Sequence, residues 1–473
     1  MQNHSLMLAP FKFAPYLPTL LLLMLLPAAT NHAADLNTSP NFLFVIADDC
    51  TYWDMECYGG QAKTPNLNRL CREGMKFTSC FQAAPMCSPT RHCLYTGIYP
   101  VKSGAYPNHT FVKPGTKSVA HYMQRAGYRV ALSGKTHINP KESFPFEYSG
   151  RSNPDMDVIS QWMTECKTGG TPFCLFACSN EPHTPWNKGD ASAYPPDSLN
   201  LPEFFVDTPA TREGYSRYLA EITYYDAQVG QLLDLLDKHG LADSTLVMVV
   251  SEQGNSFTHA KWTCYDMGLQ SGMVVRWPGR VQPGAVTDAM VEYVDVLPTF
   301  LAAAMIPEPY GLDGKSFLRV LTGEATRHKD FSYGIHTTRG INNGSDSFGI
   351  RSIRSSKYRY VLNLNPDALF TNAVNRADWW KEWVALSESG DAHAQKMVTA
   401  YQRRPGEELF DVVADPHNQI NLANKAELAE IKSELRERLM AWMASQGDEG
   451  NATEMRALEH QWRRKNRQRK PSK

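Results

Sequence analysis

Four short apolar runs, each ending abruptly in polar residues, most strongly constrain how this chain can fold. The runs cover residues 41–47, 128–132, 173–178 and 245–250. They do not alternate between apolar and polar residues and are rich in β-branched and aromatic side chains, which is typical of strands buried on both faces. Helical patterns lie between them, at 67–74, 118–127 and 215–240. Alternating strands and helices predict an α/β sandwich around a mostly parallel sheet.

The polar residues that follow the four runs are expected to share one crevice. In sheets of this kind, ligands bind just beyond the carboxyl ends of the strands. A single polar ending is ordinary, because Asp, Ser and Gly commonly form the turn after a strand. Here all four runs deliver charged or imidazole groups, and we therefore predict a common site. The side chains are those of Asp48, Asp49, Lys135, His137, His183, Glu252 and the neighbouring amide Gln253.

The chemical types of these side chains indicate a cation and an anionic substrate. Asp48, Asp49 and Glu252 are carboxylates, which raise one another's pKa values when packed together unless a cation lies between them. With the amide oxygen of Gln253 they form an all-oxygen ligand set, which favours calcium or magnesium over zinc. The lysine and histidine side chains, with Lys261 as a further candidate, suit an anionic substrate oxygen. This combination is typical of sites that transfer a tetrahedral oxyanion group.

The segment 84–97 predicts a helix N-terminus that presents a cysteine. Pro89 suits the first turn of a helix, where its missing N–H is not needed. The free backbone N–H groups of such a terminus form an anion site, with Cys87 at its mouth and Arg91 one turn further on. From these residues alone, Cys87 is either a reactive thiol with a lowered pKa or a buried structural thiol.

The N-terminal residues predict export. Residues 1–34 contain one charged residue, Lys12, and an apolar run at 17–26 that is followed by small residues. This layout predicts a signal peptide cleaved near Ala34, with a retained membrane anchor as the alternative. No later stretch approaches about 18 uninterrupted apolar residues, so no stable membrane insertion is expected. Ten cysteines without a CxxC pair give no readable disulfide pattern.

The charge balance excludes a generally basic polyanion binder. Lys and Arg number 48 and Asp and Glu 49, so nucleic acid is not an expected partner. The average conceals a basic end, because residues 456–473 contain eight basic residues and one acid, a net charge of +7, which leaves −8 for the rest. We expect residues 451–473 to be a disordered tail. The alternative is a tail that guides polyanionic glycans to the protein.

A longer motif identifies a family that this chain resembles. Cys87-x-Pro89-x-Arg91, followed by Leu94-x-Thr96-Gly97, resembles the signature of the formylglycine-dependent sulfatases of the alkaline phosphatase superfamily. The other strand-end motifs occur in the family's order, and the resemblance covers about residues 40–445. It implies an alkaline-phosphatase-like catalytic domain at 35–325. It also implies a smaller α+β subdomain with an antiparallel sheet at 326–450.

The resemblance also implies a role for each residue of the crevice. A formylglycine-generating enzyme would convert Cys87 to formylglycine (3-oxoalanine), whose hydrate attacks sulfur. One divalent cation, expected to be calcium, would be held by Asp48, Asp49, Glu252, Gln253 and the modified Cys87. Charge on the nucleophile and the sulfate would be balanced by Arg91, Lys135 and Lys261. Leaving-group protonation would fall to His183 and retention of the hydrate's second hydroxyl to His137.

Two residues depart from the family's usual pattern. Thr90 stands where the motif usually has Ser, and it keeps the hydroxyl that maturation is expected to need. Glu252-Gln253 stands where Asp-Asn or Asp-His is more common. Both residues still offer oxygen ligands, but each is one methylene longer, which changes the geometry available to the cation.

Substrate class is predicted less directly than reaction class. Residues 134–146, 273–279 and 349–354 resemble the heparan N-sulfatases, which favours N-sulfoglucosamine in heparan-type saccharides. The alternative is an O-sulfatase that acts on another sulfated polysaccharide or glycosaminoglycan. His336 and Arg351 are candidates to contact the sugar or its carboxylate, the alternative being that both are ordinary structural residues.

Two other function classes remain open at this stage. A phosphonate or phosphate ester hydrolase would use the same scaffold, although phosphatases generally carry a second, His-rich metal site that this chain lacks. A sulfated-glycan binder without catalysis is the other. The oligomeric state is not predicted by the sequence.

Overall fold

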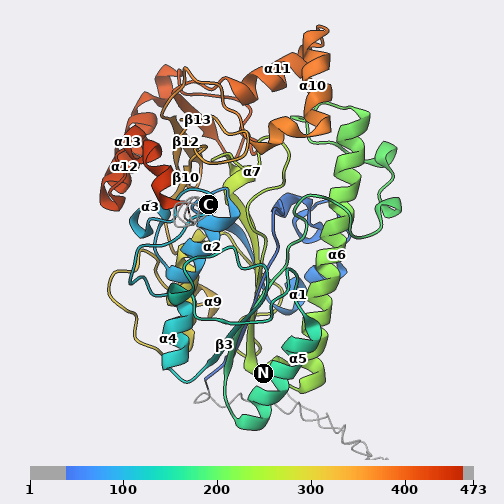
Figure 1. Ribbon diagram of the computed structural model, residues 1–473, viewed down its shortest axis with the longest axis vertical. Helices are drawn as coiled ribbons and strands as arrows, with labels where there is room; N and C mark the ends of the chain where they lie inside the picture. Colours follow the sequence, from blue (N-terminus) through green and yellow to red (C-terminus); the bar gives the residue numbers. More distant parts are fainter. Residues whose placement is uncertain (1–38, 462–473) are drawn as a thin grey trace, which may run out of the picture. The chain divides into compact units, whose positions relative to one another are not determined.

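The four predicted strands lie side by side at the centre of one large sheet (Figure 1). The computed structural model describes residues 39–461. The strands are β1 (Asn41–Ile46), β3 (Arg129–Gly134), β5 (Phe173–Cys178) and β6 (Thr245–Val250). They run in the order β3-β5-β1-β6, and each neighbouring pair is parallel. Their carboxyl ends therefore meet along one edge of the sheet, as predicted.

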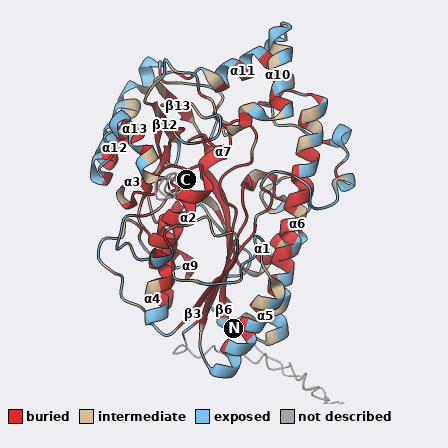
Figure 2. Ribbon diagram, viewed as in Figure 1, coloured by how far each residue is buried: buried red, intermediate tan, exposed pale blue. Residues whose placement is uncertain are grey.

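The unbroken apolar character of these strands follows from helices on both faces. In β1, Leu43 and Val45 pack in the core beneath α6 (Pro209–His239), α5 (Met156–Gly169) and α1 (Pro65–Glu73). The alternate residues Phe42 and Phe44 face the core formed with α2 (Cys87–Thr96), α4 (Val119–Arg125) and α8 (Val296–Ala303). Figure 2 shows the central strands and α2 as buried. A strand with helices on both sides has no solvent-facing positions, and thus no alternation.

Shorter and antiparallel strands complete the large sheet. Within residues 39–461 it has nine strands, in the order β4-β3-β5-β1-β6-β7-β2-β8, with β9 paired to β2. β7 runs antiparallel to both of its neighbours, β6 and β2. The remaining bounds are β2 (Met75–Phe81), β4 (Glu147–Tyr148), β7 (Gln270–Arg276), β8 (Ala285–Thr287) and β9 (Val291–Glu292). The sheet is mostly parallel, and the predicted fold class is confirmed.

A second, four-stranded antiparallel sheet follows the first in the chain. Its strands pair in sequence order. They are β10 (Ser332–His336), β11 (Ile350–Arg354), β12 (Tyr358–Asn363) and β13 (Glu407–Asp411). The helices of this part are α10 (Asp378–Glu388), α11 (Ala392–Gln402) and α12 (Ala429–Gln446). This sheet matches the predicted C-terminal one, while the bounds of 35–325 and 326–450 stay predictions.

The chain ends bear on two predictions. The signal peptide at 1–34 and the basic residues 462–473 lie outside the described part of the chain. Within the expected disordered tail, Asn451–Met455 form helix α13 and Ala457–His460 form the short helix η10. Gln461 is 6% exposed and forms a β-bridge with Thr110, so the folded chain extends eleven residues beyond the expected limit at residue 450. Among residues 39–461, no helix is long and apolar enough to cross a membrane.

Candidate active site

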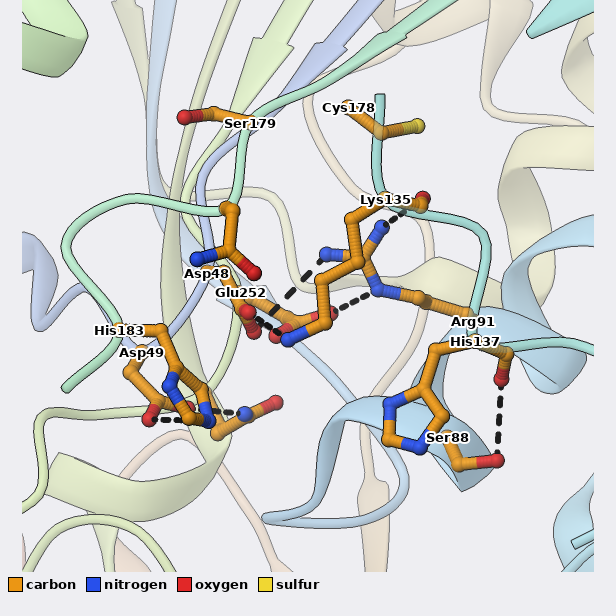
Figure 3. Close-up of polar contacts among 12 residues, drawn as sticks. Asp48, Asp49, Ser88, Arg91, Lys135, His137, Cys178, Ser179, His183 and Glu252 are labelled. Atoms are coloured by element: carbon orange, nitrogen blue, oxygen red, sulfur yellow. Dashed lines mark hydrogen bonds and ion pairs between the residues drawn. The ribbon is translucent and has the colours of Figure 1, made fainter. Parts of the chain in front are cut away.

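The carboxyl ends of β1, β3, β5 and β6 bring the predicted side chains together (Figure 3). β3 ends at Gly134, whose φ of +105° belongs to the region that favours glycine, and a Cβ there would collide with the carbonyl oxygen of Cys178. Glycine thus lets β3 lie against β5 to its last residue. The next residue, Lys135, forms an ion pair with Asp48, which follows β1.

Cys87 is the first residue of α2, as the helix-terminus argument predicts. Two hydroxyls of this turn hold it in place, because Ser88 Oγ donates to His137 O at 3.1 Å and Thr90 Oγ1 donates to Ala84 O at 2.6 Å. Burial raises the pKa of the Cys87 thiol to about 12, although the nearby Lys261 ammonium opposes the shift. An unmodified Cys87 is therefore a neutral thiol near pH 7, which argues against a reactive thiol of lowered pKa.

Arg91 lies completely buried among the carboxylates. Its Nε lies 2.7 Å from Glu252 Oε1, its Nη2 lies 3.9 Å from Asp48 Oδ1, and its Nη1 donates to Lys135 O at 3.0 Å. Because a guanidinium keeps its charge even when buried, Arg91 is a permanent positive group at the centre of the cluster.

Four side chains could hold a metal ion together. One ligand atom from each of Asp48, Asp49, Cys87 and Glu252 lies within 4.8 Å of all the others, and none of the four residues is more than 3% exposed. Within residues 39–461, no hydrogen-bond donor reaches Asp48 Oδ1, Glu252 Oε2 or Gln253 Oε1. Buried oxygens rarely stay unpaired. These oxygens fit a hard divalent cation, which binds six to eight oxygen ligands when it is calcium.

Positive and imidazole groups surround Asp49. Lys261 Nζ lies 2.6 Å from Asp49 Oδ2, and His183 Nε2 lies 3.6 Å from the same oxygen. The Asp49 charge raises the pKa of His183, but burial and the two lysine charges outweigh it and lower that pKa to about 4. His183 Nδ1 donates to Thr184 O at 2.6 Å, so the neutral ring presents an unprotonated Nε2 to the site.

His137 pairs with a histidine that the sequence did not indicate. His137 Nε2 and His109 Nδ1 lie 2.7 Å apart, and both residues have positive φ values, +50° and +57°. Burial and the charge of Lys135 lower the pKa of His137 well below its usual value. His109 lies in an irregular segment that follows no strand, so no pattern in the sequence indicates it.

The site opens into a pocket of about 660 Å³. Cys87, His137, His183 and Lys261 line it, together with His109 and three tryptophans, Trp186, Trp262 and Trp379. The carboxylates, Arg91 and Lys135 are not among its lining residues. The predicted nucleophile and the predicted proton-transfer groups thus border the pocket. Arg91, Lys135 and the carboxylates that could hold a metal ion lie behind its wall.

The structure does not bring His336 and Arg351 to this pocket. Both are 0% exposed, and neither is a lining residue. The Arg351 guanidinium pairs with Asp448 and donates to the carbonyl oxygens of His336 and Ile350. A buried guanidinium needs a counterion, and Asp448 supplies it. Arg351 therefore has a structural role next to the antiparallel sheet. The geometry therefore gives no support to the prediction that these two residues contact the sugar.

Known proteins resemble the chain over most of its length. The sulfatase family model matches residues 40–306, and the model of the C-terminal part of N-sulphoglucosamine sulphohydrolase matches residues 254–373. An ulvan-active sulfatase of Formosa agariphila is 32% identical over 87% of this chain and 82% of its own length. Human N-sulphoglucosamine sulphohydrolase is 26% identical over 85% of this chain and 89% of its own length. A structure solved with its substrate D-glucosamine-2-N,6-O-disulfate superposes with a TM-score of 0.69 at 19% identity, covering 88% of this chain and 99% of that one.

Proposed function

The chain belongs to the sulfatase family, and on that premise we propose that it hydrolyses sulfate from a saccharide through a formylglycine made from Cys87. The observation that carries this proposal is the buried set of Asp48, Asp49, Glu252 and Cys87, whose ligand atoms lie within 4.8 Å of one another. Cys87 also lines the pocket, so a substrate there can reach the modified residue while the carboxylates remain out of contact with solvent.

The charge balance of the site supports an anionic substrate. Three buried carboxylates face three basic side chains, which are those of Arg91, Lys135 and Lys261. A divalent cation, which we propose is calcium held by Asp48, Asp49, Glu252, Gln253 and modified Cys87, would supply positive charge beside the nucleophilic oxygen. With that cation bound, the site carries an excess of positive charge, which an anionic sulfate ester offsets.

The remaining residues are proposed to handle protons and charge. The atom at the Cys87 Sγ position stands for the formylglycine oxygen that attacks sulfur. Lys261 and Lys135 would stabilise negative charge on the sulfate oxygens. His183 presents Nε2 to the site and would protonate the leaving oxygen or nitrogen after taking up a proton. His137, held by His109, would retain the second hydroxyl for release of sulfate.

Two substrate classes are supported by different observations. N-sulfoglucosamine is favoured by the match of residues 254–373 to the C-terminal part of N-sulphoglucosamine sulphohydrolase. An O-sulfated polysaccharide is favoured by the 32% identity to the ulvan-active sulfatase. We propose the N-sulfated class and keep the O-sulfated class as the second candidate. Maturation by a formylglycine-generating enzyme and export after cleavage near Ala34 belong to the same proposal.

A panel of defined saccharides tests the function and separates the candidates. Each saccharide carries one sulfate, at the N, 6-O or 2-O position, and free sulfate is measured by ion chromatography. Release from the N-sulfated member supports the first candidate, and release only from O-sulfated members supports the second. Hydrolysis of a phosphonate ester, assayed beside the panel, with no release of sulfate from any saccharide would overturn both. An unmodified thiol in the Cys87 peptide of natively produced protein would favour the non-catalytic binder.

A further inference from the structure

The pocket that contains Cys87 also has a wall of aromatic side chains. Trp186 stacks on Phe257, with ring centroids 5.1 Å apart and an interplanar angle of 18°, and Phe257 in turn contacts Trp379 at 5.0 Å. A Cβ on Gly214 of α6 would approach Trp186 to 3.3 Å, so glycine leaves room for the indole. Trp186 and Trp379 both line the pocket. This aromatic wall offers flat apolar surface of the kind that packs against the C–H face of a sugar ring.

The aromatic wall ends next to an arginine without a counterion. Arg376 closes the short helix η8 (Ala373–Arg376) and lines the same pocket. Within residues 39–461 no hydrogen-bond or ion-pair partner is assigned to its side chain. Every other charged side chain of the pocket lining has an ion-pair partner. Lys261 pairs with Asp49, and Arg217 pairs with Glu213, which also lines the pocket. Asp378 Oδ1 lies 2.7 Å from Lys381 Nζ.

The backbone that carries Arg376 is held in place from both sides. Asn372 caps η8, since its Oδ1 accepts from Val374 N at 3.0 Å and its Nδ2 donates to Tyr401 Oη at 3.0 Å. On the other side α10 begins at Asp378, and its Trp379 is 5% exposed. The unpaired guanidinium therefore extends from an anchored turn, so binding an anion with it requires little ordering of the main chain.

We propose that Arg376 and the aromatic wall form a subsite for the sugar next to the sulfated one, and that this second sugar carries an anionic group. The inference rests on the proposed function, which places the reacting sulfate at Cys87. A planar guanidinium binds either a carboxylate or a second sulfate through two parallel hydrogen bonds. The substrate is then at least a disaccharide of a polyanionic chain, and Arg376 binds the anionic group of its second sugar.

The expected effect of removing this contact is on binding and not on chemistry. Arg376 is exposed, so we expect the weak end of the range for a hydrogen bond to a charged group. Its loss should lower affinity about tenfold, which corresponds to about 1.4 kcal/mol. Because Arg376 touches none of the proposed reacting groups, Arg376→Ala should raise KM about tenfold and leave kcat unchanged.

Three disaccharides test the subsite, all with the same sulfated residue. The neighbouring sugar is a uronate in the first, its carboxyl-reduced neutral form in the second and an O-sulfated sugar in the third. Kinetic constants are measured for wild type, Arg376→Ala and Arg376→Lys, with Arg403→Ala as the control. Arg403 is an exposed arginine at the end of α11 that does not line the pocket. A small aryl sulfate reports the reaction without the subsite.

Each outcome decides the proposal. If Arg376→Ala raises KM for the uronate disaccharide, the ligand of Arg376 is a carboxylate. If it raises KM for the disaccharide with an O-sulfated neighbour, the ligand is a sulfate. In either case KM of Arg376→Lys should lie between those of wild type and Arg376→Ala. Equal KM changes for the charged and the neutral disaccharides, or none, overturn the subsite. If wild type releases sulfate from none of the disaccharides and not from the aryl sulfate, the proposed function fails. Calorimetric binding of the three disaccharides to Cys87→Ser protein and to the Cys87→Ser/Arg376→Ala double variant then still tests the subsite.

Discussion

Calcium should stabilise the folded protein, because the buried carboxylates that would bind it come together only in the folded state. A ligand at 100 times its dissociation constant that binds only the folded state contributes about 2.7 kcal/mol. Unfolding entropy of about 2.1 cal/mol/K per residue gives residues 39–461 roughly 0.9 kcal/mol/K, so the melting temperature should rise by about 3 °C. Magnesium should give a smaller rise, because it dehydrates less readily than calcium.

Glu252→Gln is the variant that locates this effect. It keeps the shape of the side chain and removes one buried charge, so a tenfold weaker site at the same calcium concentration should give about 1.4 kcal/mol. The expected shift in melting temperature is then about half that of wild type. Glu324→Gln, which removes a carboxylate that is 62% exposed, is the matched control and should keep the full shift. Scanning fluorimetry with and without a chelator measures all three proteins. Equal shifts in Glu252→Gln and wild type, or no shift in wild type, would refute the assignment of the cation to this cluster.

Three further predictions concern individual side chains. His109→Ala should lower kcat about tenfold on an aryl sulfate with little change in KM, because it removes the 2.7 Å contact that orients His137, and His109→Gln should restore part of the loss if orientation is the cause. Burial raises the pKa of Glu221 from 4.5 to about 8, so the folded state favours the protonated carboxyl. This contribution to the stability of wild type is present in full below 4.5, falls as the pH rises from 4.5 to 8 and levels off above 8. Thermal melts at a series of pH values across that window should show a smaller loss in Glu221→Gln, and equal losses would contradict the reasoning. Arg351→Met should lower the free energy of unfolding by about 3–5 kcal/mol, because it leaves the Asp448 carboxylate buried without a counterion, and chemical denaturation measures the loss. A raised KM in the folded variant protein would instead indicate that Arg351 contacts the sugar.

The parallel strand ends are the part of the site that sequence reasoning predicts well. An unbroken apolar run implies a central strand, and its carboxyl end fixes where the next polar residue lies. Asp48, Lys135 and Glu252 each lie within two residues of the end of such a strand, and the structure brings them together around Arg91. The helix start at Cys87 is predicted for a similar reason, because Pro89 and the motif around it determine local geometry.

Side chains positioned by distant partners are not predictable in this way. Arg351 lies on a strand, but its direction is set by Asp448, which is 97 residues further along the chain. His109 reaches His137 from an irregular segment with a positive φ, which no periodic pattern reveals. Arg376 joins the pocket only because η8 and α10 fold beside α6. The chemistry of the reacting centre could therefore be predicted from local patterns, whereas the wall that selects the substrate depends on tertiary packing.

Sulfate release by Cys87 variants shows whether the nucleophile is made from Cys87. Wild type, Cys87→Ala and Cys87→Ser are produced together with a formylglycine-generating enzyme and assayed on the saccharide that wild type cleaves best. Wild type should release sulfate and its Cys87 peptide should carry an aldehyde, whereas both variants should lose nearly all activity while they stay folded. Full activity in either variant would contradict a nucleophile made from Cys87.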